Sequence, residues 1–420
     1  MKRVLIIGGG ASGLMAAVSA ARAGAAVTVL EHNKQVGKKL LVTGNGRCNL
    51  TNVNQESDNY RGNHPEFARK TLKAFGMHDV LRLFTELGVF TKNRNGYLYP
   101  YSDQASAVVD ALRMEAEHRK VKLALQAQIQ SIDQREGTFL VQTDGWTYEG
   151  DAIILAAGSC AAPQTGSDGS GYAFARKFGH SIVKPLPALV QLRSGDRIFE
   201  KLAGLRMDAA VTLLADAEAA DQAEERKEGQ VLARDQGEVQ FTGYGLSGSP
   251  VFQVSRYAAR ALEEGKTVRA LLDLMPVFET EDFASYLEVR IEEGFYKSSE
   301  QLLVGLFPRK MIECLLERSG ISKQKKAGEL TLEERRKLVA SCKEFEVTIS
   351  GSNGFEQAQV CCGGVDTAEV KPVTMESRLI SGLYFAGEIL DVDGACGGYN
   401  LQWAWSSGYL AGLHAAGGSL

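Results

Sequence analysis

The first residues whose types and spacing could bind a ligand are three glycines near the start of the chain. Gly8, Gly10 and Gly13 form the pattern G-x-G-x-x-G directly after an apolar run at residues 4–7. The first glycine of this pattern permits a tight turn, the second lets the backbone approach a pyrophosphate, and the third lets a helix pack closely on its strand. The amides and positive dipole end of the following helix would face the phosphates. The chemistry predicted here is dinucleotide binding.

The residues after this turn complete a strand–helix–strand unit. An alanine-rich helical pattern covers residues 14–23, and a second apolar run at residues 26–30 ends in Glu31. An acid at this distance can accept a hydrogen bond from a ribose 2′-hydroxyl and disfavours a 2′-phosphate, so we expect FAD or NAD rather than NADP as the tight ligand. The competing interpretations are a turn that only packs a helix and a secretory signal peptide. Three successive glycines inside the apolar stretch argue against the signal peptide.

A second glycine-rich cluster lies near the other end of the chain. Residues 383–386 are apolar and lead into Gly387, and a loop containing Gly397 and Gly398 precedes a helical pattern at residues 401–411. The start of this helix would present its positive dipole end to a ligand. That end suits the negative charge that a reduced flavin gathers.

A polar, glycine-rich loop at residues 43–52 holds a further candidate, Arg47, which could pair with an anionic substrate or with a structural carboxylate. Tyr97, Tyr99 and Tyr101 alternate as on one face of a strand, for which core packing is the favoured interpretation. A tyrosine could instead deliver a proton opposite a hydride, so Arg47 and Tyr99 are the catalytic candidates. The six histidines form neither a Ser/His/Asp nor a metal-ligand pattern, and no metal site is expected.

The composition is typical of a soluble globular protein of two or three domains: 420 residues, 44% hydrophobic and 23% charged, with a net charge of −4. No basic run is present, so we expect a small-molecule substrate and no nucleic-acid partner. No apolar stretch reaches the roughly 18–20 residues of a membrane helix, so we expect a cytoplasmic protein without a membrane partner. The sequence does not indicate an oligomeric state.

The cysteines are odd in number and scattered. None of the seven belongs to a C-x-x-C pair, so neither a disulfide framework nor a metal cluster is predicted, and a reducing compartment fits. Adjacent Cys361 and Cys362, which precede a predicted glycine turn, are interpreted as small buried residues. Thiol chemistry at Cys48 or Cys396 is not favoured, because neither has a partner motif.

The order of apolar patterns predicts an α/β chain. Before the middle of the chain, the patterns predict a helix at residues 103–117, a small β-meander at residues 121–132, 138–143 and 146–148, and a buried strand at residues 151–158. Pro185 and Pro187 mark a boundary. Strands are then expected over residues 188–253, interrupted by a solvated hairpin tip at residues 216–229; helices follow over 279–343 and a strand at 345–349.

The phrases G-K-K-L-L-V-T-G-N-G-R-C-N-L-T-N (37–52) and G-L-Y-F-A-G-E-I-L-D-V-D-G-A-C-G-G-Y-N-L-Q-W-A (382–404) resemble the BaiN/YhiN-like family of bacterial FAD-dependent oxidoreductases, which includes aminoacetone oxidase-like proteins. The resemblance spans nearly the whole chain. It implies a discontinuous Rossmann-type FAD-binding domain (1–187 and 350–420), an inserted β-barrel-like domain (188–275 and 344–349) and a nested helical domain (276–343). Family activities include reduction of carbon–carbon double bonds in bile-acid intermediates and oxidation of aminoacetone. One departure is Gly243, where the family phrase F-T-H-x-G-L-S-G-P has a histidine, so no general-acid role is carried over; a structural turn joining a strand to a helix is favoured.

The resemblance and the residue chemistry together predict a cofactor site with two halves. Lys39 would neutralise a pyrophosphate or be a solvated helix-end charge, and the loop of residues 44–48 would wrap the flavin face. The predicted FAD-binding residues are Gly8, Gly10, Ala11, Ser12, Gly13, Glu31, Lys38, Lys39, Gly44, Asn45, Gly46, Arg47, Cys48, Ala157, Gly158, Gly387, Glu388, Asp393, Gly397, Gly398, Tyr399, Asn400, Leu401 and Gln402.

The favoured function is reduction of a small enone or steroid-like acceptor, with NADH or NADPH visiting the flavin transiently because no second G-x-G-x-x-G follows a strand. One alternative is an amine or aminoketone oxidase that returns electrons to oxygen. Another is a non-catalytic flavin redox sensor or RNA-associated scaffold, which the absence of a basic run disfavours.

Overall fold

The computed structural model describes residues 1–216 and 229–420, and the chain divides into two compact units. Unit 1 comprises residues 1–186 and 355–420, and unit 2 comprises residues 187–354. Each unit has its own hydrophobic core. The expected solvated hairpin tip at 216–229 lies almost wholly outside the described residues. The three-domain division, in which the helical segment separates from the inserted strands, stays a prediction.

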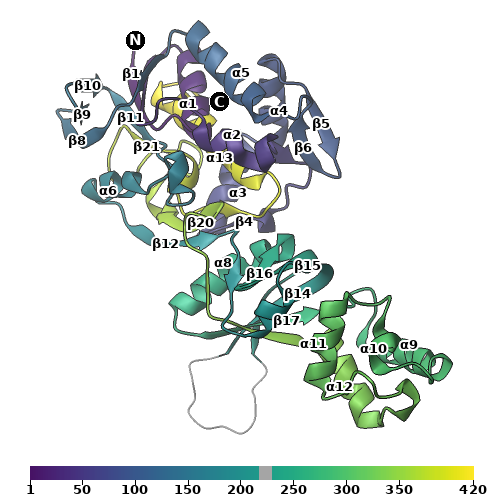
Figure 1. The fold of residues 1–420 in the computed structure, drawn as a ribbon. Coiled ribbons are helices and arrows are strands. Elements are labelled where there is room, and N and C mark those ends of the chain that lie inside the picture. The colour runs from purple at the N-terminus through teal and green to yellow at the C-terminus, as the bar shows by residue number, and fades with distance from the viewer. Residues whose placement is uncertain (217–228) are drawn as a thin grey trace. The chain divides into compact units, whose positions relative to one another are not determined.

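A five-stranded parallel sheet forms the centre of unit 1 (Figure 1). Its strands, in spatial order, are β21 (Leu383–Phe385), β11 (Ala152–Leu155), β1 (Arg3–Ile7), β2 (Ala26–Glu31) and β7 (Lys122–Leu125). Every neighbouring pair is parallel. All four residues of β11 are buried, as a central parallel strand covered on both faces requires. The predicted Rossmann-type sheet is therefore confirmed.

Helices from both ends of the chain pack beside this sheet. The helices of unit 1 are α1 (Ala11–Arg22), α2 (Lys38–Val42), α3 (Pro65–Ala74), α4 (Met77–Glu86), α5 (Ala105–His118), α6 (Ser170–Lys177) and α13 (Tyr399–Ala415). The close approach of α1 and α13 depends on two glycines: a Cβ on Gly408 would stand 2.4 Å from the Ser12 carbonyl oxygen, and one on Gly412 would stand 2.2 Å from that of Ala16. Only residues without a side chain permit this spacing.

Four small antiparallel sheets complete unit 1. They are β8 (Ile129–Arg135), β9 (Thr138–Thr143) and β10 (Thr147–Gly150); β3 (Thr51–Asn52), β6 (Tyr97–Pro100) and β5 (Thr91–Arg94); β12 (Ile182–Ala188) with β20 (Val360–Val365); and β4 (Tyr60–Arg61) with β22 (Asp393–Gly394). The predicted meander is confirmed as β8, β9 and β10, but only residues 129–132 of its first predicted segment belong to it. Residues 122–125 form β7 and extend the parallel sheet, because Lys122 aligns with Thr28 of β2.

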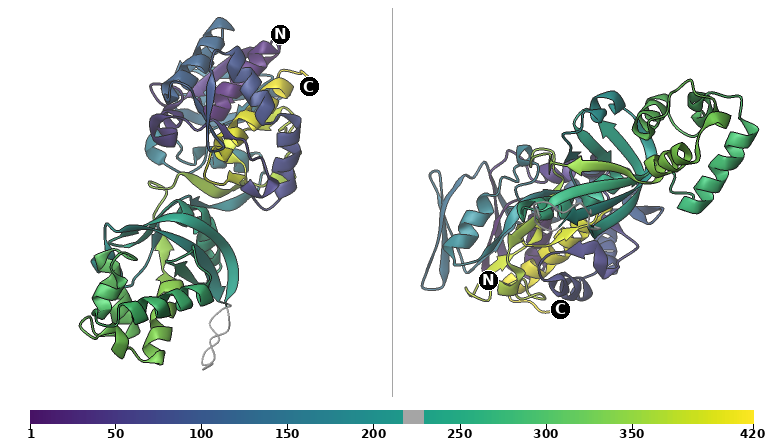
Figure 2. Two further views of the ribbon diagram at one scale, coloured as in Figure 1. Left: turned by 90° about the vertical axis from the view of Figure 1, so that its right-hand side faces the viewer. Right: turned by 90° about the horizontal axis from the view of Figure 1, so that it is seen from below.

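Unit 2 is built on one antiparallel sheet of seven strands. In spatial order they are β18 (Phe345–Ile349), β17 (Thr267–Asp273), β14 (Arg206–Asp216), β15 (Gln230–Thr242), β16 (Gly245–Gly248), β13 (Leu192–Arg193) and β19 (Gly351–Ser352). The two outer strands, β18 and β19, are separated only by Ser350, so the sheet curves back on itself through this segment. Figure 2 shows these curved strands from two further sides. This topology agrees with the expected barrel-like arrangement.

The helices of unit 2 pack into the same core as the sheet. They are α7 (Ile198–Leu202), α8 (Ser249–Glu263), α9 (Thr280–Glu293), α10 (Ser299–Leu303), α11 (Arg309–Ser319) and α12 (Leu332–Lys343). Capping boxes fix two of their starts: the Ser298 side chain accepts from the Gln301 amide before α10, and Thr331 accepts from Glu334 before α12. The helices predicted over residues 279–343 are present as α9, α10, α11 and α12.

The boundary expected at Pro185 and Pro187 is confirmed, because unit 2 begins at Pro187, although both prolines lie within β12, which continues to Ala188. Two other local expectations need correction. Gly363 and Gly364 lie inside β20 and not in a turn, since a Cβ on Gly363 would stand 2.4 Å from the Lys184 carbonyl oxygen of the paired strand. Gly243 lies between β15 and β16, so it joins two strands before α8 begins.

Candidate functional site

The residues predicted to bind the dinucleotide gather at one edge of the parallel sheet. Four adjacent strands end there, and each is followed at once by a predicted site segment: Gly8 after β1, Glu31 at the end of β2, Ala157 after β11 and Gly387 after β21. Ligands of open parallel sheets bind at the carboxyl ends of the strands. The topology thus brings together residues that are up to 379 positions apart in the sequence.

The glycine turn has the geometry that a pyrophosphate requires. Gly8 has φ +101°, and a Cβ there would stand 2.5 Å from the Ala156 carbonyl oxygen. A Cβ on Gly13 would stand 1.9 Å from the carbonyl oxygen of Gly8, whereas one on Gly10 would meet no atom within 4 Å. Gly10 precedes α1, and no side chain caps that helix. The start of α1 thus has no side-chain cap, and the position beside Gly10 is open, so the turn fits the predicted cofactor.

Glu31 is buried, and its carboxylate is fixed by local hydrogen bonds. One oxygen accepts from the Gly9 amide at 2.8 Å, and the other accepts from the backbone and side-chain nitrogens of Asn33, each at 2.8 Å. A carboxylate oxygen has more than one acceptor position, so these bonds orient Glu31 without saturating it. The carboxylate remains chemically able to accept from ribose hydroxyls.

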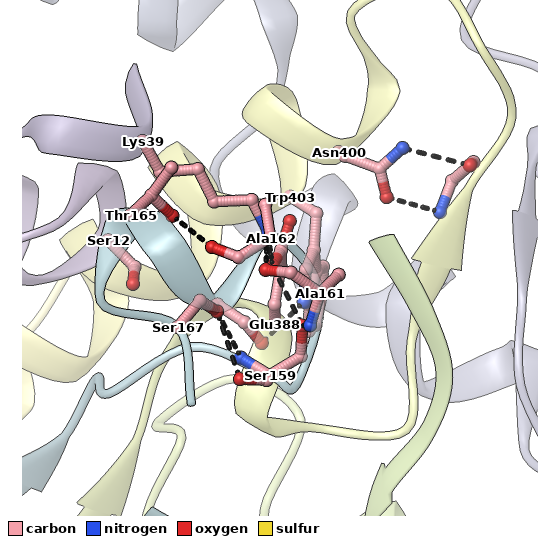
Figure 3. A network of polar contacts seen from close by, with 12 residues as sticks. Ser12, Lys39, Ser159, Ala161, Ala162, Thr165, Ser167, Glu388, Asn400 and Trp403 are labelled. Carbon is pink, nitrogen blue, oxygen red and sulfur yellow. Dashed lines mark hydrogen bonds and ion pairs between the residues drawn. The ribbon is translucent and has the colours of Figure 1, made fainter. Parts of the chain in front are cut away.

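A polar network links the two predicted halves of the site (Figure 3). The Lys39 ammonium lies 2.7 Å from a Glu388 carboxylate oxygen and also donates to the Ala161 carbonyl at 3.2 Å. Ser159 donates from its hydroxyl to the same Glu388 oxygen at 3.2 Å. Lys39 is therefore not a solvated helix-end charge. It connects the segment after β2 to the segment after β21.

The loop at residues 43–48 is held in an unusual backbone conformation. Gly44, Asn45, Gly46 and Cys48 all have positive φ values, of 56°, 56°, 80° and 59°. Such values are strained for cysteine, and strain of this kind gathers at ligand-binding loops. Burial raises the pKa of the Cys48 thiol to about 12. Cys48 is thus an inert, buried thiol, in agreement with the sequence interpretation.

Two predicted residues of the C-terminal cluster, Asn400 and Gln402, form hydrogen bonds with neighbouring segments of the protein. The Asn400 side chain accepts from the Gly394 amide at 2.8 Å and donates to its carbonyl at 2.9 Å. Fully buried Gln402 accepts from the Thr51 hydroxyl at 2.6 Å and donates to Ser406 at 2.9 Å. These amides join β22 and β3 to α13. Their role as direct FAD ligands, like that of Asp393, Gly397, Gly398, Tyr399 and Leu401, stays a prediction.

Tyr97 and Tyr99 of β6, and Tyr101 directly after it, do not pack in the core, so the expectation of core packing was wrong. Leu98 is buried, whereas Tyr97 is 41% and Tyr101 63% exposed. The Tyr99 ring is flanked by two guanidinium groups, those of Arg47 at 5.5 Å and Arg94 at 5.8 Å from the ring centre. Arg47 forms no ion pair with a carboxylate in the described parts of the chain; it donates to the Gly44 carbonyl at 3.2 Å.

The face of β6 that carries these tyrosines also borders both predicted ligand loops. A Cβ on Gly44 would lie 3.7 Å from the Tyr99 ring, and one on Gly397 would lie 2.8 Å from the Tyr97 ring. The structure therefore brings the catalytic candidates Arg47 and Tyr99 together beside the loops that would enclose the flavin.

The sequence reasoning missed four residues of the site. Ser159 and Ser167 brace the loop after β11: the Ser159 amide donates to the Ser167 hydroxyl, which donates back to the Ser159 carbonyl, both at 3.0 Å. Trp403 donates from its indole nitrogen to the Gly387 carbonyl at 3.0 Å. Asn33 orients Glu31. The sequence signal for Ser159 is its place shortly after the buried strand β11, and Trp403 lies within the motif at residues 382–404.

The fold and the site define a Rossmann-type dinucleotide-binding protein. Residues 2–414 match the family described as "HI0933-like protein Rossmann domain", and the chain belongs to this family. The family resemblance inferred from the two motifs is thereby confirmed. The match supports FAD as the dinucleotide and flavin-dependent oxidoreductase as the class.

Three curated relatives align over nearly their full lengths. One from Clostridium scindens, named "3-dehydro-bile acid delta(4,6)-reductase", is 46% identical over 99% of both chains. Two are named "Ribosomal RNA dihydrouridine synthase": that of Haemophilus influenzae is 30% identical over 97% of both chains, and that of Escherichia coli is 31% identical over 96% of both chains.

Among the described residues, no helix combines the length and apolar character needed to cross a membrane. The same residues contain no cluster of three or more metal-ligating side chains.

Proposed function

We propose that this chain is an FAD-dependent reductase that saturates a carbon–carbon double bond conjugated to a carbonyl in a small, steroid-like acceptor. The observation that carries the proposal is the 46% identity, over 99% of both chains, to a protein named as a bile acid reductase. We further propose a reduced nicotinamide as the electron source and the cytoplasm as the compartment.

Different residues of the chain would bind different parts of FAD. The amides at the start of α1 would hold the pyrophosphate, Glu31 would accept from the ribose, and the Lys39–Glu388 pair would sit between the two halves of the cofactor. When bound, FAD would supply the hydride chemistry. The protein would contribute orientation and electrostatics.

The exposed face of β6 is the proposed substrate side. Arg47 and Arg94 flank the Tyr99 ring. Arg94 is ion-paired with Asp103 at 2.8 Å, so Arg47 is the cation proposed to receive an anionic group on the acceptor, such as a carboxylate. The Tyr99 hydroxyl is proposed to deliver the proton that reduction of a conjugated double bond requires in addition to the hydride.

An anaerobic titration of the yellow protein with NADH and then NADPH tests the electron source. Bleaching of the flavin absorbance at about 450 nm, followed by reoxidation on adding a 3-keto-4-ene steroid, supports the reductase. If neither nucleotide bleaches bound flavin but an amine or aminoketone does, with oxygen as the acceptor, the proposal fails and the oxidase alternative replaces it.

A second candidate substrate is ribosomal RNA, favoured by the names of the two relatives at 30% and 31% identity. Making dihydrouridine saturates the uracil double bond next to a carbonyl, so the bond chemistry is the same. The expectation of no nucleic-acid partner, drawn from net charge, therefore has no support. Exposed Tyr97 and Tyr101 near Lys92 and Arg94 offer rings on which a base could stack.

A paired assay separates the two substrates. The reduced protein is given either a steroid enone or unmodified ribosomal RNA, and the products are measured by mass spectrometry. Steroid reduction without dihydrouridine supports the favoured proposal. Dihydrouridine without steroid reduction overturns it in favour of RNA.

A further inference from the structure

The turn that follows β21, here called the Gly387 turn (residues 386–389), contacts the first turn of α1. Gly387 has φ +79°, and a Cβ there would stand only 2.4 Å from the Ser12 hydroxyl oxygen. Ser12 donates this hydroxyl to the Ala386 carbonyl at 3.3 Å, across 374 positions of the sequence. The glycine at position 387 therefore permits a direct approach of two segments from opposite ends of the chain.

Helix α13 binds the same turn with two further side chains (Figure 3). The Trp403 indole nitrogen donates to the Gly387 carbonyl at 3.0 Å, and the Gly387 amide donates to the Ser407 hydroxyl at 2.9 Å. Ser407 in turn donates to the Trp403 carbonyl at 2.6 Å, so the two side chains belong to one network. Both are buried, and water therefore does not compete for these bonds.

These contacts fix the peptide groups on both sides of Gly387. The peptide before Gly387 is bonded at its carbonyl by Ser12 and at its amide by Ser407. The peptide after Gly387, which leads to Glu388, is bonded at its carbonyl by Trp403. Glycine has the widest backbone freedom of any residue, so bonds to both peptides are needed to hold Glu388 in one orientation.

Glu388 and Ser12 belong to different parts of the proposed FAD site. The Glu388 carboxylate lies 2.7 Å from the Lys39 ammonium, in the pair proposed to sit between the two halves of FAD. Ser12 lies in the helix turn whose amides are proposed to hold the pyrophosphate. The Ser12 hydroxyl therefore connects the segment proposed for the ADP half to the segment that carries Glu388.

We infer that Ser12 and Trp403 are positioning residues that hold the Gly387 turn, and with it Glu388, in the orientation that binds FAD beyond its ADP half. The inference rests on the proposed FAD site and is independent of the acceptor. ADP alone would occupy the glycine turn after β1, whereas FAD would need that turn and the Gly387 turn together. Loss of either side-chain bond should therefore weaken FAD binding and spare ADP binding.

The test compares FAD and ADP binding to the full-length apoprotein by isothermal titration calorimetry. In Ser12→Ala and in Trp403→Phe, the FAD dissociation constant should rise at least about fivefold, as expected for one lost hydrogen bond, and the ADP dissociation constant should stay within about twofold of wild type. At saturating FAD, the visible circular dichroism of the bound flavin should differ from that of wild type in both variants, because the turn beside it has moved.

Ser19→Ala is the matched control. Ser19 lies in the same helix as Ser12, is also buried, and donates its hydroxyl to the Tyr409 carbonyl at 2.7 Å. The substitution thus removes the same kind of long-range bond from α1 at a place away from the Gly387 turn. It should lower the thermal stability of the apoprotein and leave the ratio of the FAD and ADP dissociation constants at the wild-type value.

The inference is overturned if the two dissociation constants rise by the same factor in Ser12→Ala, if neither changes, or if Ser19→Ala alters their ratio as much. An unchanged flavin spectrum in both variants would also contradict it. Failure of the proposed FAD site gives a different result, since wild type itself would then bind no FAD and the inference would fall with it. ADP binding reports whether the first turn of α1 is folded, and Ser12→Ala decides alone if Trp403→Phe does not fold.

Discussion

The Lys39 ammonium and the Glu388 carboxylate, 349 residues apart, lie 2.7 Å from each other beside the carboxyl edge of the parallel sheet. Both side chains are mostly buried, with 23% and 20% exposed. Removing one partner of such a pair leaves the other charge uncompensated. The pair therefore links the two ends of the chain through charge as well as through packing.

The first prediction is that Lys39→Met weakens FAD binding. Glu388 would then present an unpaired negative charge to an anionic cofactor, and we expect the FAD dissociation constant to rise about tenfold, or about 1.4 kcal/mol. Flavin fluorescence during titration of the apoprotein measures it. Lys39→Arg should retain most of the affinity, and Lys34→Met, which removes an exposed lysine of the same charge, is the matched control. Equal losses in Lys39→Met and Lys34→Met would contradict the prediction.

The second prediction is that Gly10 and Gly13, two glycines of one motif, have different roles: Gly10 in cofactor binding and Gly13 in folding. Gly10→Ala should cost less than about 1 kcal/mol of unfolding free energy, since its φ of −77° is allowed and its Cβ meets open space. The added methyl group would stand in the proposed pyrophosphate path, so FAD affinity should fall at least about tenfold.

Gly13→Ala should instead destabilise unit 1 by about 3 kcal/mol or more, because its Cβ would stand 1.9 Å from the Gly8 carbonyl oxygen. Thermal unfolding of the apoproteins compares the two variants without the cofactor. If Gly10→Ala loses as much stability as Gly13→Ala, the prediction is contradicted, because Gly10 would then be needed for folding and not only for binding the cofactor.

The third prediction concerns Tyr99→Phe, which keeps the ring between Arg47 and Arg94 and removes only the hydroxyl. Flavin reduction by the nicotinamide should be unchanged, whereas reoxidation by an enone acceptor should slow by about a hundredfold or more, since a positioned proton donor contributes that much. Stopped-flow absorbance measures both half-reactions. Tyr101→Phe, which alters a more exposed ring on the same face, is the control. Undiminished reoxidation in Tyr99→Phe would remove Tyr99 as the proton donor.

The sequence predicted the parallel sheet and its ligand edge because the residues that define them are local: a glycine turn between two apolar runs fixes a strand, a turn and a helix over 31 residues. It did not predict contacts between distant segments. The Lys39–Glu388 pair depends on how the segments after β2 and β21 are placed in space, and sequence spacing does not report that placement.

The prediction that Tyr97, Tyr99 and Tyr101 pack in the core was wrong for a different reason. Strict alternation shows that three side chains share a face, but it does not say which face is buried. Leu98 occupies the buried side, leaving Tyr97 and Tyr101 exposed. Similarly, the sequence of residues 122–125 suits either a meander strand or an added strand of the parallel sheet. Only its parallel pairing with β2 shows that it belongs to the parallel sheet.

The last prediction concerns pH and His180. Its side chain is fully buried, with Nδ1 3.0 Å from a Glu369 oxygen and Nε2 2.8 Å from the Ser377 hydroxyl. Burial lowers the pKa of His180 below the ordinary value of 6.5, although Glu369 opposes the shift. The folded protein therefore binds a proton at His180 less readily than the unfolded chain, so this contribution to stability is complete above about pH 6.5 and is lost as the pH falls from there through the lower folded-state pKa.

Urea unfolding followed by tryptophan fluorescence measures this effect in unit 1, which contains all three tryptophans. Wild type should lose more stability between pH 7.5 and 5.5 than His180→Gln, at about 1.4 kcal/mol for each unit by which the fold lowers the pKa. His118→Gln, which alters a histidine at the exposed end of α5, should follow the wild-type profile. A larger pH dependence in His180→Gln than in wild type would mean that the ion pair with Glu369, and not burial, governs this histidine.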